Sequence, residues 1–327
     1  IVLIYTVLGG FLAVSLTDMI QAFFMIITLV VLPIIAISDK GGLHIMISSL
    51  KALDPALIDP LSLTVGGIIG YLGIGLGSPG NPHILARYMS IDDPRQLRVS
   101  ALMGTVWNVF MAWGAVYIGL IGRTFYPNIN MLPAGDQENL FPVLAQAHLH
   151  PILFGMVIAA IFAAIMSTAD SQLLVAASGI VRDVYQKMLH KNEDIPQKKL
   201  VLYSRIVVTL LVIMSLILAI SASQIIFWLV LFAWGGLGAS IGPTIILSLF
   251  WKKTTKWGVV AGLVSGTLIT IIWNQTPALK SMIYELVPAF VISTVLTIIV
   301  SLFTSPPPNA EKDLELIATK YRNRKKI

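Results

Sequence analysis

Long runs of apolar residues alternate with short polar segments over almost the whole chain. A helix needs about 20 apolar residues to cross the roughly 30 Å hydrocarbon layer of a bilayer. Runs of that length predict transmembrane helices, because a helix satisfies its own backbone in lipid and barrel strands would be far shorter. We expect eight spans and assign them to residues 8–37, 62–88, 100–125, 151–180, 201–221, 225–250, 257–274 and 286–304.

Composition agrees with this all-α polytopic membrane protein. Charged residues make up only 12% of the chain, and the apolar share with glycine counted and tyrosine left out is about 61%, against about 45–50% for a soluble domain. A soluble enzyme, a disordered chain and a nucleic-acid binder are therefore poor fits, despite the net charge of +6. The chain has no cysteine, which leaves no disulfide, thiolate metal site or thiol nucleophile. It begins inside an apolar run, so we expect a C-terminal fragment of a longer protein.

The basic residues predict an orientation. Of the 22 Lys and Arg, 18 fall in alternate loops and in the tail, and the opposite loops hold only Lys40, Lys51, Arg123 and Lys280. Because cytoplasmic loops are enriched in basic residues, we expect a cell-membrane protein with a cytoplasmic C-terminus. We divide the chain into a transmembrane region, 1–305, and a basic tail, 306–327, that anchors the protein or binds anionic lipid.

Two acidic residues, Asp18 and Asp170, lie inside predicted spans, where a charge is costly. No Lys or Arg lies at comparable depth to neutralise them. A bound cation is one explanation, and a protonated acid hydrogen-bonded between helices is the other.

The segment around Asp170 has a pattern suited to an alkali cation. Ala164, Ser167 and Thr168 share one helix face, and Ser171 extends that face by a turn. Hydroxyl and carbonyl oxygens are hard donors that suit a hard cation. The alternative is that these small residues only allow close helix packing.

The second predicted span contains a break. Two prolines and four glycines within residues 73–83 cannot continue an ordinary helix. Unwound backbone at membrane depth is tolerated where it lines a cavity or is buried in protein, and transporters use such breaks to expose backbone polar groups to solute and ion. The alternative is a helix that ends before a cytoplasmic loop. A glycine-rich stretch with aromatic residues, 232–243, is a further candidate for lining a cavity or for core packing.

Four segments together resemble the sodium:solute symporter family, and most closely its proline-permease branch. They are Gly9–Ser15 with Thr17 and Asp18, Gly80–Arg87, Ala163–Thr168 with Gln172–Leu174, and Ala233–Gly236 running to Gly242 and Pro243. The resemblance implies an inverted-repeat core of five plus five helices. On that template the chain holds the last helix of the first repeat, the whole second repeat and two additional helices, and it lacks the first four core helices.

The resemblance also implies binding residues. The family's main sodium site maps here onto Ala164, Ser167 and Thr168, and a second sodium site onto Asp18, Ser167, Asp170 and Ser171. For the solute we expect Ile74, Gly77, Ser78, Pro82 and Trp234. Ile74 and Ser78 stand where proline permeases have Trp and Tyr, and Asn81 replaces a Gln, so the solute is proline or another amino acid or small carboxylate.

We therefore expect Na⁺-coupled symport of a small organic solute by alternating access. Na⁺ is the coupling ion, no other cofactor is implied, and the partners are the ion, the solute and membrane lipid, without nucleic acid. No P-loop, HExxH or GxSxG motif is present, so we expect no enzyme. Two alternatives stay open: a proton-coupled transporter of the same fold, with Asp18 and Asp170 as the relay, and a transporter-fold membrane sensor. The short tail counts against the sensor.

Overall fold

The computed structural model describes residues 2–59, 61–191, 193–221, 226–312 and 314–316. Within these ranges all regular structure is helical, as expected. The helices are α1 (Val2–Asp39), α2 (Leu43–Leu53), η1 (Pro55–Ile58), α3 (Val65–Gly73), η2 (Ile74–Gly80), α4 (Pro82–Met89), α5 (Gln96–Phe125), η3 (Ile129–Met131), η4 (Pro133–Gly135), η5 (Gln137–Asn139), α6 (Leu140–His148), α7 (Pro151–Ser178), η6 (Gly179–Leu189), α8 (Gln197–Ser221), α9 (Ile226–Phe250), α10 (Lys256–Gln275), α11 (Pro277–Lys280) and α12 (Leu286–Leu302).

Six helices in the described part of the chain are long and apolar enough to cross a membrane: Gly10–Asp39, Gln96–Phe125, Pro151–Leu189, Gln197–Ile220, Ile226–Phe250 and Lys256–Gln275. They overlap six of the expected spans. The other two differ, because 62–88 is divided among α3, η2 and α4, and α12 has only 17 residues. The chain is thus a multi-pass membrane protein, and the total of eight spans stays a prediction.

The chain forms two compact units, and each is built from separate stretches of sequence. Unit 1 consists of Ile1–Ser62 and Ile91–Ser223, and unit 2 of Leu63–Ser90 and Gln224–Ile327. The segment that carries the broken helix therefore packs with the C-terminal helices rather than with its neighbours in sequence.

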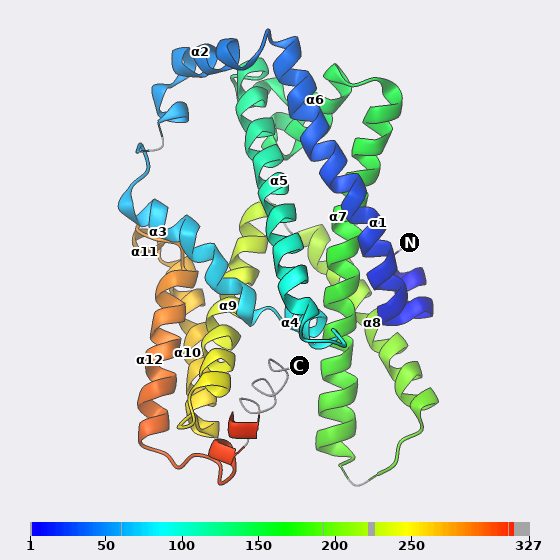
Figure 1. Cartoon of the computed structure of the whole chain (residues 1–327), viewed down its shortest axis with the longest axis vertical. Helices are drawn as coiled ribbons and strands as arrows, with labels where there is room; N and C mark the ends of the chain where they lie inside the picture. Colours follow the sequence, from blue (N-terminus) through cyan, green and yellow to red (C-terminus); the bar gives the residue numbers. More distant parts are fainter. Residues whose placement is uncertain (1, 60, 192, 222–225, 313, 317–327) are drawn as a thin grey trace. The chain divides into compact units, whose positions relative to one another are not determined.

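In unit 1, α1 packs against α7 and α5 (Figure 1). Leu32 on α1, Ile121 on α5 and Val157 on α7 are fully buried in the core that these helices share. Gly10 interrupts α1 with a φ of 60°, a conformation that glycine adopts at little cost. The apolar run alone does not reveal this interruption.

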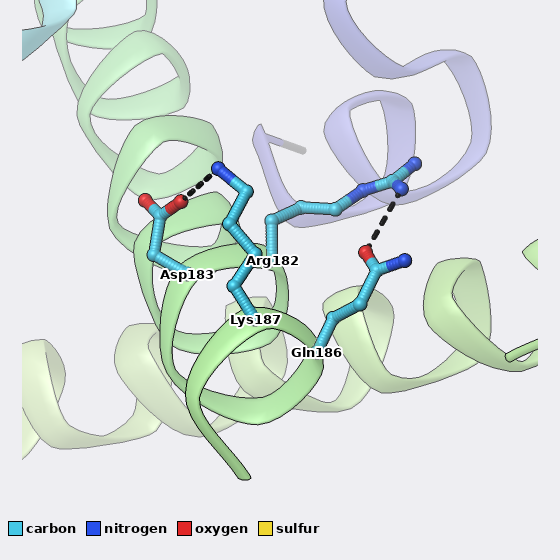
Figure 2. A network of polar contacts seen from close by, with 4 residues as sticks. All are labelled: Arg182, Asp183, Gln186 and Lys187. Atoms are coloured by element: carbon cyan, nitrogen blue, oxygen red, sulfur yellow. Dashed lines mark hydrogen bonds and ion pairs between the residues drawn. The ribbon is translucent and has the colours of Figure 1, made fainter. Parts of the chain in front are cut away.

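The far end of α7 continues without a break as the π-helix η6 (Figure 2). The Arg182 guanidinium donates to the side chains of Gln186 and, at 2.8 Å, of Gln197 at the start of α8. Lys187 and Asp183 form an ion pair one turn apart. Of these contacts, the bond from Arg182 to Gln197 ties the end of the long helix to α8.

In unit 2, α9, α10 and α12 pack against one another, and η2 lies against α9 and α12. Several glycines of α3 and η2 sit where a side chain would collide with a neighbour. A Cβ on Gly66 would lie 2.0 Å from the Met282 carbonyl oxygen, and one on Gly73 would lie 2.2 Å from the Val287 side chain. Glycine therefore allows the broken helix to approach its neighbours closely.

Candidate functional site

The break predicted in the second span is present. The α-helix α3 gives way at Gly73 to the 3-10 helix η2, and a new α-helix, α4, begins at Pro82. Proline at the first turn of α4 costs no hydrogen bond, because the first amides of a helix have no internal partner. Asn81, between the two, is buried, and its side-chain amide donates to the Gly77 carbonyl at 2.8 Å. The break is a fixed, internally bonded structure.

Three of the five predicted solute residues are brought into contact. The Trp234 indole N–H of α9 donates to the Ile74 carbonyl of η2 at 2.9 Å, and a Cβ on Gly77 would lie 2.0 Å from the same indole nitrogen. The other two are placed on the break itself, with Ser78 in η2 and Pro82 opening α4. The indole N–H is therefore satisfied by a bond within the protein, and this bond holds η2 against α9.

The predicted sodium residues lie on one face of α7. The hydroxyls of Ser167 and Thr168 both donate to the Ala164 carbonyl, at 3.2 and 3.1 Å. Because each hydroxyl donates its proton to that carbonyl, the lone pairs of the hydroxyl oxygen remain available to coordinate a cation. Ser167 is partly buried and Thr168 is exposed. The face thus presents oxygen donors of the hard type that suits Na⁺.

The two membrane-depth acids are both buried, Asp18 on α1 and Asp170 on α7, and these helices pack against each other. The Ser171 hydroxyl lies 2.9 Å from the Ser167 carbonyl, to which it donates, and 3.2 Å from a carboxylate oxygen of its neighbour Asp170. One turn from Asp18, the buried side-chain oxygen of Gln21 has no hydrogen-bond partner among the described residues. The second sodium site stays a prediction.

A further polar cluster, which sequence reasoning missed, lies between α10 and α12. Glu285 is only 4% exposed and accepts from the Asn274 amide at 2.9 Å. The Tyr284 hydroxyl donates to the Leu231 carbonyl at 2.5 Å, and burial, with a smaller effect from the Glu285 charge, raises the pKa of this phenol. The cluster borders a cavity of about 200 Å³. The signal in the sequence is an acid directly before the last apolar run, just outside the predicted spans.

A comparison of the sequence with protein families decides the classification. The sequence profile of the sodium:solute symporter family matches residues 1–266. The chain belongs to this family.

Curated members of the family at 37–39% identity are transporters of proline by their names. The osmoregulated proline transporter OpuE of Bacillus subtilis is 37% identical over all of this chain, and the high-affinity proline transporter PutP of the same organism is 39% identical over 96% of it. The sodium/proline symporter of Staphylococcus aureus is 37% identical over 94%. The chain spans 66%, 66% and 61% of the length of these three proteins.

A solved structure shows the same fold. It is the substrate-bound outward-open state of a Na⁺-coupled sialic acid symporter, and it aligns with 93% of this chain and 65% of its own at a TM-score of 0.69 and 21% identity. The transporter fold implied by the sequence resemblance is therefore confirmed for this family member. The individual ion and solute residues stay predictions.

Proposed function

We propose that this chain belongs to a Na⁺-coupled symporter that moves a small organic solute by alternating access. The observation that carries the proposal is the oxygen face of α7, where Ser167 and Thr168 turn their hydroxyl protons inward onto one carbonyl. With the Ala164 carbonyl, from which a bound ion would displace these protons, they supply hard donors for a sodium ion. No covalent step is needed, and no nucleic acid takes part.

Coupling requires that Na⁺ bind one state of the transporter more tightly than the other. An ion with equal affinity for both states would shift neither population. A single helix face offers an incomplete coordination shell, so the remaining ligands must come from another element that can approach or leave α7. The exposed Thr168 suits such a site, because its outer side is open to a further ligand.

A second Na⁺ is proposed between α1 and α7. Its ligands are Asp18, Ser167, Asp170 and Ser171, and the Gln21 side-chain oxygen is a further donor on the same part of α1. A Na⁺ here would balance one of the two negative charges that Asp18 and Asp170 carry when ionised, and so lower the cost of holding them at this depth.

The solute is proposed to be proline, another amino acid or a small carboxylate, bound at the broken helix. The names of the relatives support proline. Ile74 and Ser78 offer less aromatic surface to a proline ring than the residues found in proline permeases. The packing of Trp234 on Gly77 means that η2 and α9 must separate slightly, or that the solute uses the rim of this contact.

The test is uptake of labelled L-proline into proteoliposomes that contain the full-length protein, with an inward Na⁺ gradient, an inward proton gradient or neither. We expect uptake above the passive level only with the Na⁺ gradient, and its loss when an ionophore dissipates that gradient. Uptake driven by protons alone, and abolished by Asp18→Asn, would establish the proton-coupled alternative instead. If the full-length protein accumulates no amino acid or small carboxylate under either gradient, the proposed symport is wrong.

A further inference from the structure

A cavity in unit 2 is not used by the proposed ion sites. Its walls come from α3 and the first residue of η2, the start of α9, the end of α10 and the segment that joins α10 to α12. At about 200 Å³ it is smaller than the roughly 300–1,000 Å³ of sites for drug-sized ligands, which limits its occupant to a small metabolite. It borders Ile74, so it adjoins the break at which the solute is proposed to bind.

The most informative group in the cavity wall is the carboxylate of Glu285. It is 4% exposed, and the Asn274 amide satisfies one of its oxygens. None of the ion pairs found in the described part of the chain includes Glu285. A buried carboxylate with only an amide partner is a strong site for a positively charged group, because a cation offsets the cost of burying the charge.

The rest of the wall suits a molecule with an ammonium group at one end and a carboxylate at the other. Trp228 and Tyr71 line the cavity and are half-exposed, so two aromatic rings of the kind that attract a cation belong to its wall. Lys280 lines it too, together with the N-terminal turn of α3 at Thr64 and Gly66. A cationic side chain and a helix N-terminus both favour an anion.

The cavity is also held in shape before any ligand arrives. The Trp273 indole N–H donates to the Ile283 carbonyl at 3.1 Å, and the Tyr284 hydroxyl donates to the Leu231 carbonyl. These bonds tie the segment that carries Glu285 to α10 and α9. A preformed site loses little conformational entropy on binding.

We propose that this cavity is a binding site for a small amino-acid zwitterion, whose ammonium group pairs with Glu285 and whose carboxylate faces Lys280 and the start of α3. The inference rests on the proposed function in one respect: the site would bind the transported solute next to the broken helix. By the distribution of basic residues, it lies on the external side.

Equilibrium binding to the purified full chain, in detergent and in KCl without sodium, tests the proposal. The probes are L-proline, pyrrolidine, which has only the amine, and cyclopentanecarboxylate, which has only the carboxylate. We expect Glu285→Gln to weaken L-proline and pyrrolidine about thirtyfold or more, because truncating a buried charged pair is costly. Lys280→Met should weaken L-proline and cyclopentanecarboxylate and leave pyrrolidine unchanged. Glu138→Gln, at an exposed acid of unit 1, is the matched control and should change nothing.

Two measurements guard against a misfolded variant. Glutamine keeps an acceptor for Asn274, so the melting temperature of Glu285→Gln should stay close to that of the parent. Trp228→Leu removes a half-exposed ring of the cavity wall together with its contact to Phe227, and it should also weaken pyrrolidine binding. The proposal is overturned if the parent binds no amine probe, or if Glu285→Gln binds the amines as the parent does. Sodium-driven uptake measured in parallel separates the two claims, because uptake without amine binding overturns only this inference, and amine binding without uptake overturns only symport.

Discussion

At the scale of single residues, the informative group is the Thr168 hydroxyl. It donates to the carbonyl four residues earlier, as many Ser and Thr side chains in helices do. Thr105 on α5 makes the same bond, to the Ala101 carbonyl at 2.8 Å, and is exposed as well. The two threonines therefore share their local geometry and differ in the surroundings that a sodium ligand would require.

We expect Thr168→Ala to raise the Na⁺ concentration that gives half-maximal uptake by about tenfold or more. The variant loses one oxygen ligand of the ion, and a contact of this kind to a charged group contributes about as much as a charged hydrogen bond. Thr105→Ala should leave this concentration unchanged. The measurement is the initial rate of proteoliposome uptake as a function of external Na⁺. An equal shift in both variants, or none in Thr168→Ala, would remove Thr168 from the ion site.

At the scale of elements, the contact between η2 and α9 needs glycine at one position of η2 and not at another. Gly77 and Gly75 both lie in η2, but a Cβ on Gly77 would meet the Trp234 ring and one on Gly75 would meet nothing within 4 Å. The ring cannot simply turn away, because its N–H is bonded to the Ile74 carbonyl.

Gly77→Ala should therefore lower the stability of the protein by about 1–3 kcal/mol, the usual cost of overpacking. Gly75→Ala should be neutral or slightly stabilising, because alanine restricts the unfolded chain. Thermal unfolding of both variants, purified in one detergent, tests this. Equal melting temperatures would mean that η2 and α9 do not pack as described.

The same element shows what the sequence could predict. Proline and glycine act locally, so the break at residues 73–83 was predictable, and so was the shared face of Ala164, Ser167 and Thr168, which needs only helical periodicity. The close packing of Gly77 on Trp234 was not, because the partner lies far away in sequence. The Glu285 cluster was missed for a similar reason, since its burial depends on the way α10, α12 and α9 pack.

At the scale of the whole molecule, the path of the chain across the membrane depends on the broken helix. Lys51 lies on α2 and Lys253 lies between α9 and α10, and both are exposed. Four long apolar helices separate them, Gln96–Phe125, Pro151–Leu189, Gln197–Ile220 and Ile226–Phe250. An even number of crossings would leave both lysines on one side. If the broken segment α3–η2–α4 also crosses, the number becomes odd and they lie on opposite sides.

The absence of cysteine from the chain allows a direct test. Lys51→Cys and Lys253→Cys each introduce a single thiol, and a membrane-impermeant maleimide is added to intact cells and then to permeabilised cells. The unsubstituted chain measures background. Because the loop around Lys253 is basic, we expect it to be cytoplasmic and Lys51→Cys alone to be labelled from outside. Labelling of both thiols on the same side would mean that the broken helix does not traverse the bilayer. A reversed pattern would place the basic tail outside.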